Sequence, residues 1–321
     1  MFPEDELNEA RRFNRTLKLA PRFRAPGLLV QFMIQSSMRM GQAMVSRLAP
    51  GVRASTRRVD WKGNGLNLRI LRAEGPLRGV YLDYHGGGWS IGNAAMDDPV
   101  NSLIAKELGL AVVSVDYPLL PAVTLARMID ACVAAADWVF ENAHTEFGAE
   151  NVVIGGESAG AHLAACTLLR LKAERADFAR LKGAVLIYGP FDLSGTASAR
   201  SAAADALVLH GPSLHGGLSK LAPGPDEVRR DPAISPLYAE LTGLPPAIFV
   251  VGTLDPLIDD SRLMAARWNE QSGNAELLVA PDAPHAFNRL PTRMAARTNA
   301  HVRDWVKDRL GARAAARAAA E

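Results

Sequence analysis

The sequence has little of what would place it outside the ordinary globular class. Two cysteines in 321 residues are too few for a disulfide-stabilised scaffold, and no CxxC or HExxH spacing indicates a metal site. Lysine plus arginine exceeds aspartate plus glutamate by only 36 to 34, which gives no reason to expect nucleic acid or an anionic membrane as partner. The apolar run at 27–34 is short and interrupted by Gln31, so it predicts no membrane span.

These absences, together with a polar N-terminus unlike a signal peptide, predict a cytoplasmic protein with no stable membrane insertion. Cys132 and Cys166 both lie in stretches rich in alanine and leucine, which is typical of small buried residues in a reducing compartment. The sequence predicts no metal and no cofactor. It leaves open whether two copies form a homodimer.

From about residue 80 onward, short β-branched runs alternate with longer segments of helical spacing. Apolar residues recur at steps of three and four over 124–142 and again over 159–172, as on the buried face of a helix. This alternation predicts an α/β fold with a doubly wound, mostly parallel sheet. The expected strands begin near Val80, Ala111, Asn151, Ala184, Ala247 and Ala275.

Other segments do not follow this alternation. Residues 56–61 and 66–73 flank a Lys-Gly-Asn-Gly turn and predict an antiparallel hairpin at the sheet edge. Residues 1–50 are helical in pattern and rich in methionine, while 192–232 are rich in serine, alanine, glycine and proline. We therefore expect an α/β core of 51–191 and 233–321, with 1–50 as N-terminal cap helices and 192–232 as an inserted cap segment.

The strongest chemical motif is the GESAG segment at 156–160, which follows an expected strand and opens an expected helix. A sharp turn at this place exposes a serine hydroxyl, and crowding at the turn favours glycine on both sides. The N-terminus of the helix that follows directs backbone N–H groups and a positive dipole end toward developing negative charge. Ser158 is therefore the candidate nucleophile.

The HGGGW segment at 85–89 ends the strand that begins near Val80. Three consecutive glycines are typical of a flexible loop, but they also let backbone N–H groups approach a substrate oxygen closely. One such donor contributes about 3 to 4 kcal/mol of transition-state stabilisation. We expect His85 to shape this loop through a backbone hydrogen bond rather than to act as a base.

Two later loops supply a carboxylate and an imidazole. Asp255 follows the strand that begins at Ala247, and His285 follows the last expected strand. Loops at the carboxyl ends of parallel strands meet at one edge of the sheet. A carboxylate there can orient a histidine that takes the serine proton. Asp260 is the alternative carboxylate, although Asp259 and Asp260 fall in a first helical turn where acidic residues complement the dipole.

The order serine, aspartate, histidine is the α/β-hydrolase order. Through HGGGW, GESAG, TLDPL and HAF, residues 80–290 resemble the hormone-sensitive-lipase-like carboxylesterases of bacteria. The resemblance implies a catalytic triad of Ser158, Asp255 and His285, an oxyanion hole formed by the N–H groups of Gly87, Gly88 and Ala159, and a helical cap. The chain departs from the family pattern at Glu157, where relatives usually have Asp or Thr, and at 116–121, where DYPLLP replaces DYRLAPE.

The predicted function is hydrolysis of small carboxylic esters with short to medium acyl chains through an acyl-enzyme. The expected pocket lining comprises Trp89, Phe32, Met33, Leu207 and Leu209. The alternatives are amide hydrolysis of the arylformamidase type, which the Gly-Ala-His-Leu at 160–163 also resembles, and a non-catalytic ligand receptor on the same fold. Receptors of that kind lose the catalytic histidine, so the presence of His285 argues against this last reading.

Overall fold

The computed structural model describes residues 2–24, 27–44 and 48–318; parts of the expected N-terminal cap, at 1, 25–26 and 45–47, and the final residues 319–321 lie outside them. A central sheet has the strand order β1-β2-β4-β3-β5-β6-β7-β8. β1 (Val52–Trp61), β2 (Asn64–Ala73) and β4 (Leu110–Asp116) pair antiparallel in that order, and every other neighbouring pair is parallel. The predicted fold class and edge hairpin are thus present.

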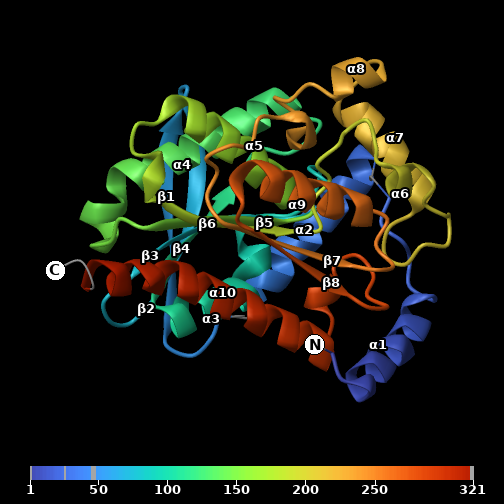
Figure 1. The fold of residues 1–321 in the computed structure, drawn as a ribbon. Helices are drawn as coiled ribbons and strands as arrows, with labels where there is room; N and C mark the ends of the chain where they lie inside the picture. Colours follow the sequence, from blue (N-terminus) through green and yellow to red (C-terminus); the bar gives the residue numbers. More distant parts are fainter. Residues whose placement is uncertain (1, 25–26, 45–47, 319–321) are drawn as a thin grey trace.

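The parallel strands are mostly apolar because helices cover both of their faces. Besides β4, they are β3 (Gly79–Tyr84), β5 (Val152–Glu157), β6 (Leu181–Ile187), β7 (Ala247–Gly252) and β8 (Ala275–Ala280). Helices α4 (Leu125–Phe147), α5 (Ala159–Glu174) and α9 (Ile258–Ser272) lie on one face of the sheet, and α3 (Asp98–Leu108) and α10 (Arg293–Ala318) lie on the other (Figure 1). Two buried apolar clusters, one on each face, result from this layering.

The 192–232 segment forms three short helices beside the carboxyl ends of the strands. These are α6 (Ala197–Arg200), α7 (Gly211–Leu221) and α8 (Asp226–Arg229). A backbone bridge between Phe23 and Leu209 joins this segment to the N-terminal region. The remaining short elements are the 3₁₀ turns η1 (Ala94–Asp97), η2 (Phe178–Arg180), η3 (Pro236–Tyr238) and η4 (Phe287–Arg289).

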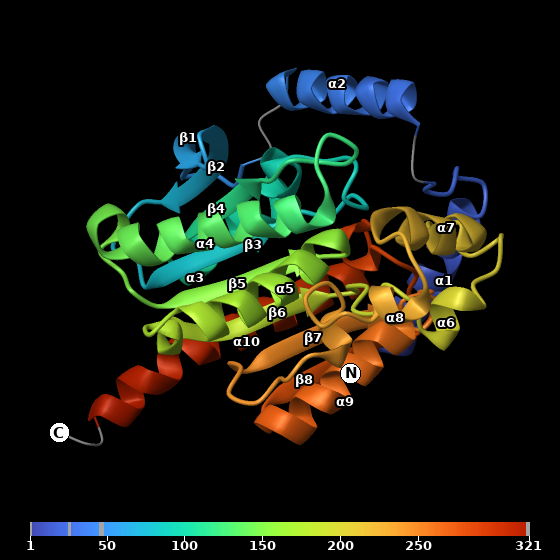
Figure 2. The ribbon, with the colours of Figure 1, turned by 90° about the horizontal axis from the view of Figure 1, so that it is seen from above.

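The two N-terminal helices have different surroundings. Helix α1 (Glu4–Leu17) packs on α10, where Arg293 pairs with Asp5 and Glu9 and Arg297 pairs with Glu6. Helix α2 (Leu28–Met44) lies along one side of the molecule, away from the sheet layers (Figure 2). Helix α1 also reaches the loop after β8, where Arg11 pairs with Asp282 and Asn14 donates to its backbone oxygen.

Candidate active site

Ser158 occupies a strained turn between β5 and α5. Its backbone has φ +54° and ψ −119°, a conformation that a non-glycine residue adopts only when the surroundings impose it. A side chain at Gly160 would overlap the backbone oxygen of Tyr84, and one at Gly156 would collide with the backbone of Gly160. The glycines of the GESAG motif are required because strand, turn and helix approach each other so closely.

The three residues predicted to act together do lie in one hydrogen-bonded row. His285 Nε2 is 3.0 Å from Ser158 Oγ, and His285 Nδ1 is 2.8 Å from Asp255 Oδ2. Asp255 is fully buried, and its Oδ1 accepts a hydrogen bond from the backbone N–H of Leu257 at 2.9 Å. Since an ionised carboxylate only accepts, Nδ1 carries the ring proton, and Nε2 is free to accept the serine proton.

Asp260, the alternative carboxylate, has a different role. It is buried and accepts hydrogen bonds from the backbone N–H groups of Phe191 and Asp192 and from the hydroxyl of Thr196. Burial raises the pKa of Asp260 to about 7. The expectation that it only complements the helix dipole is therefore wrong, because it fixes the chain after β6.

The glycine loop lies directly against the nucleophile turn. A Cβ added at Gly86 would come within 3.1 Å of the Glu157 backbone oxygen and 3.7 Å of Ser158 Cβ. Gly87 and Gly88 have φ of +118° and +59°, and a side chain at Gly87 would overlap the backbone of Ile91. The loop backbone is thereby held beside Ser158 in a conformation that glycine alone adopts without strain.

His85 and its neighbours brace the start of this loop. His85 Nδ1 lies 2.7 Å from the backbone oxygen of Gly86, and its ring stacks on Tyr117 with centroids 4.2 Å apart. The Tyr117 hydroxyl donates to the backbone oxygen of His85 at 2.6 Å. His85 is thus engaged with backbone, and it is His285 that contacts the serine.

Trp89 and His162 brace the other end of the loop. The indole N–H of Trp89 points at His162 Nδ1 at 3.3 Å, and His162 Nε2 donates to the backbone oxygen of Ile234 at 2.8 Å. Both ring nitrogens have a role only in the neutral imidazole, because protonated Nδ1 cannot accept from Trp89. Burial accordingly lowers the pKa of His162 to about 4.

This pKa predicts a loss of stability in acid. As pH falls from about 6.5 toward 4, the imidazole of His162 becomes protonated in the unfolded chain but stays neutral in the folded chain. Each pH unit in this window should therefore cost about 1.4 kcal/mol of unfolding free energy. In His162→Gln the decrease between pH 7 and pH 5 should be about 2 kcal/mol smaller than in the parent, measured by urea unfolding. The matched control His144→Gln, at an exposed histidine, should behave like the parent; equal acid sensitivity of all three proteins would contradict the assignment.

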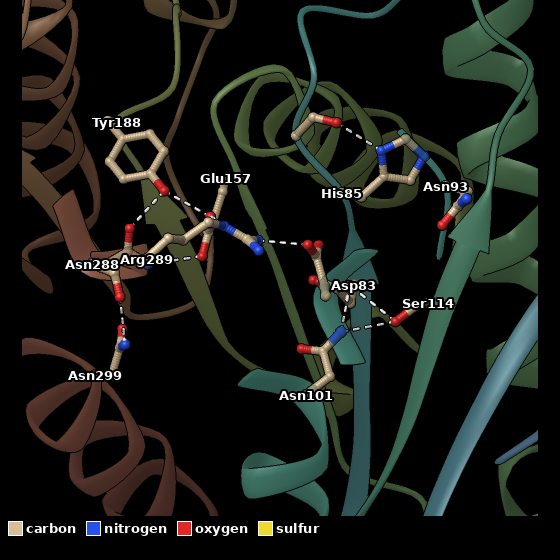
Figure 3. A network of polar contacts seen from close by, with 12 residues as sticks. Asp83, His85, Asn93, Asn101, Ser114, Glu157, Tyr188, Asn288, Arg289 and Asn299 are labelled. Atoms are coloured by element: carbon tan, nitrogen blue, oxygen red, sulfur yellow. Dashed lines mark hydrogen bonds and ion pairs between the residues drawn. The ribbon is translucent and has the colours of Figure 1, made fainter. Parts of the chain in front are cut away.

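Glu157, the departure from the family pattern, belongs to a buried polar network behind the nucleophile (Figure 3). Its carboxylate accepts from the Tyr188 hydroxyl at 2.6 Å, from Asn288 Nδ2 at 2.8 Å and from Arg289 Nε at 2.5 Å. Arg289 also pairs with Asp97 at 2.5 Å. Burial acts to raise the pKa of Glu157, but the Arg289 charge and these hydrogen bonds outweigh it and lower the pKa.

The network ties the nucleophile to the histidine loop. Asn288 and Arg289 lie three and four residues after His285, in η4. The Tyr188 ring packs on the imidazole of His285 with centroids 4.5 Å apart while its hydroxyl holds Glu157. No motif in the sequence marks Tyr188 or Arg289, so neither was predicted; the unusual Glu157 is the one signal that points to them.

A cavity of about 500 Å³ opens beside Ser158 and His285. Trp89 and Leu209 line it as predicted, and Leu207 is buried outside the lining. Phe32 and Met33 do not line it either, because their side chains face outward from α2 with 70% and 60% exposed. Much of the remaining wall is apolar, and α2, η1 and α7 contribute Leu28, Gln31, Met96, Leu214, Leu218 and Leu221 to it.

The fold and the arrangement of Ser158, His285 and Asp255 beside the glycine loop are those of an α/β-hydrolase. Comparison with known proteins agrees. Residues 81–289 match a family model described as the α/β-hydrolase fold, so the chain belongs to that family. The carboxylic ester hydrolase LipN of Mycobacterium tuberculosis is 30% identical over 218 residues, which are 64% of this chain and 56% of LipN. An acetyl esterase of Salmonella choleraesuis is 26% identical over 89% of this chain and 91% of its own length.

Solved structures show the same likeness. A hormone-sensitive lipase from a metagenome library superposes with a TM-score of 0.79 at 26% identity, covering 94% of this chain and 98% of the other. The predicted fold class and the predicted hormone-sensitive-lipase-like esterase family are confirmed. The protein is a serine carboxylesterase of that family. Among the described residues, no helix is both long and apolar enough to cross a membrane.

Proposed function

We propose that the protein hydrolyses small carboxylic esters with short to medium acyl chains through an acyl-enzyme on Ser158. The observation that carries the proposal is the continuous hydrogen-bonded row from Ser158 through His285 to Asp255. It lies at the wall of a cavity large enough for a small ester. The acetyl esterase and LipN relatives support the same class of substrate.

In the first half of the reaction, His285 Nε2 takes the proton of Ser158 as Oγ attacks the ester carbonyl. Asp255 stabilises the imidazolium that forms. We assign the oxyanion to the backbone N–H groups of Gly87, Gly88 and Ala159, because the glycine loop adjoins Ser158 and Ala159 begins α5. The alcohol then leaves with the proton from His285.

In the second half, water attacks the acyl-enzyme with His285 again as base, and the acid is released with Ser158 restored. No cofactor takes part in these steps. We further assign α2 and residues 192–232 to a cap, since both contribute to the cavity wall. Helix α1 stands outside this role because it packs on α10.

Hydrolysis of p-nitrophenyl esters of increasing acyl length tests the proposal. We expect kcat/KM to be highest for acyl chains of about two to eight carbons and to fall for much longer chains, whose extended length carries them out of the 500 Å³ cavity. The same preparation should hydrolyse N-formylkynurenine at least about 100-fold less efficiently. A reversed preference would replace the ester hydrolase with an amide hydrolase on the same triad.

A further inference from the structure

Helix α2 is attached to the protein by its polar side rather than by its apolar side. Gln31 donates to the backbone oxygens of Ser90 and Leu120 at 2.5 and 2.6 Å. Gln35 exchanges two hydrogen bonds with the backbone of Gly92, and Gln42 exchanges two with the side chain of Asn93. The three glutamines share one helix face, since their spacing of four and seven corresponds to whole turns.

The opposite face of α2 carries large apolar side chains that contact little. Five are more than half exposed, an arrangement inverted from that of a helix on an aqueous surface. They are Leu29, Val30, Phe32, Met33 and Met40. Figure 2 shows α2 as the outermost element along its side of the molecule, so the described residues place nothing over this face.

The charge around α2 indicates what covers it. Residues 10–59 contain eleven lysines and arginines and no aspartate or glutamate, although the whole chain is nearly balanced. The rest of the chain therefore has 25 basic against all 34 acidic residues. Arg11, Arg53 and Arg57 pair with acidic side chains. Lys18, Arg24 and Arg39 are exposed, and none of these three has a salt-bridge partner in the part of the chain that the structure describes.

We propose that α2 and its basic flanks dock the protein on an anionic lipid surface, with the apolar face at the level of the acyl chains and the arginines among the headgroups. An apolar helix face rimmed by cations is the usual form of such a peripheral contact. A second copy fits less well, because a twofold contact would bring two basic segments together. The docking does not depend on the proposed ester specificity.

This docking also orients the catalytic cavity. Leu28 and Gln31 of α2 belong to the cavity wall, so a surface that covers the outer face of α2 lies beside the cavity mouth. The apolar residues would enter the interface without the helix crossing the bilayer. The overall charge is nearly balanced, so composition alone does not show the excess of basic residues in 10–59. For this reason composition argued against a membrane partner.

Co-sedimentation with vesicles tests the proposal on the full chain. We expect binding to phosphatidylglycerol–phosphatidylcholine vesicles that 0.5 M salt weakens, and little binding to phosphatidylcholine alone. Phe32→Ser with Met33→Ser should reduce the partition coefficient at least tenfold. Arg24→Gln with Arg39→Gln should reduce it more than tenfold, since each cation near an anionic surface contributes about fivefold.

Control variants separate docking through α2 from a general loss of folding or of surface hydrophobicity. Leu263→Ser, at an exposed leucine of α9, should bind vesicles like the parent. All these variants should hydrolyse a water-soluble p-nitrophenyl ester at the parental rate, which shows that the fold and the triad are intact. Equal binding to neutral and anionic vesicles, or no binding, would overturn the proposal. So would a concentration-dependent dimer, seen by light scattering, that Phe32→Ser with Met33→Ser dissociates.

Discussion

Ser158→Ala is expected to lower kcat for p-nitrophenyl butyrate by about 10⁶, and His285→Ala by a similar factor. The two residues act as one unit, because His285 Nε2 is placed to take the proton of Ser158 Oγ at 3.0 Å. The double variant should therefore lose little more than either single one. Asp255→Asn should cost about 10⁴, since it reverses the hydrogen bond that fixes the imidazole tautomer.

The control for these variants is His144→Ala, at an exposed histidine in the last turn of α4 and outside the cavity wall, which should keep parental activity. Circular dichroism and urea unfolding would establish that each variant is folded. Residual turnover within tenfold of the parent in His285→Ala would show that another group removes the serine proton. The fully buried His162, with its lowered pKa, and the backbone-bonded His85 are not placed to do so.

The second large effect concerns the ion pairs behind the nucleophile. Arg289→Met leaves Glu157 and Asp97 without their cation, while both carboxylates stay buried. Removing one partner of a buried pair typically costs 3–5 kcal/mol. Because the Arg289 side chain is about a quarter exposed, we expect a loss of about 3 kcal/mol in the free energy of unfolding, measured in urea.

Arg289 also holds η4, which begins two residues after His285. Its loss should misplace the imidazole slightly and lower kcat by about 10- to 100-fold, since a displacement near 1 Å can have this effect. The double variant Glu157→Gln with Arg289→Met should be less destabilised than Arg289→Met, because one uncompensated charge is removed with its partner. Arg53→Met, at an arginine paired with Glu74 on the surface, is the matched control and should cost under 1 kcal/mol. An Arg289→Met protein as stable as this control would contradict the role of the network.

The residues of the proposed triad could be brought together from the sequence because short local motifs mark each of them. A strand followed by GESAG can only turn sharply at Ser158, and the strand ends place Asp255 and His285 at the same sheet edge. The lining of the pocket was harder to predict, since Phe32 and Met33 are apolar and were expected to face inward. The glutamines of α2 instead satisfy the backbone oxygens of Ser90, Leu120 and Gly92, which turns the apolar face outward.

The sequence by itself determined the fold class, the succession of the loops that follow the parallel strands, and the turn at Ser158. Hydrophobic periodicity and glycine spacing reveal these features because they depend on residues close together in the chain. The tertiary structure alone decided which buried charges meet. Glu157, Arg289 and Asp97 come from three separate segments of the chain. A buried charge is costly unless it is paired, and only the folded chain brings these three side chains together. It also decided the orientation of α2, since the acceptors that its glutamines satisfy lie 57 to 89 residues away.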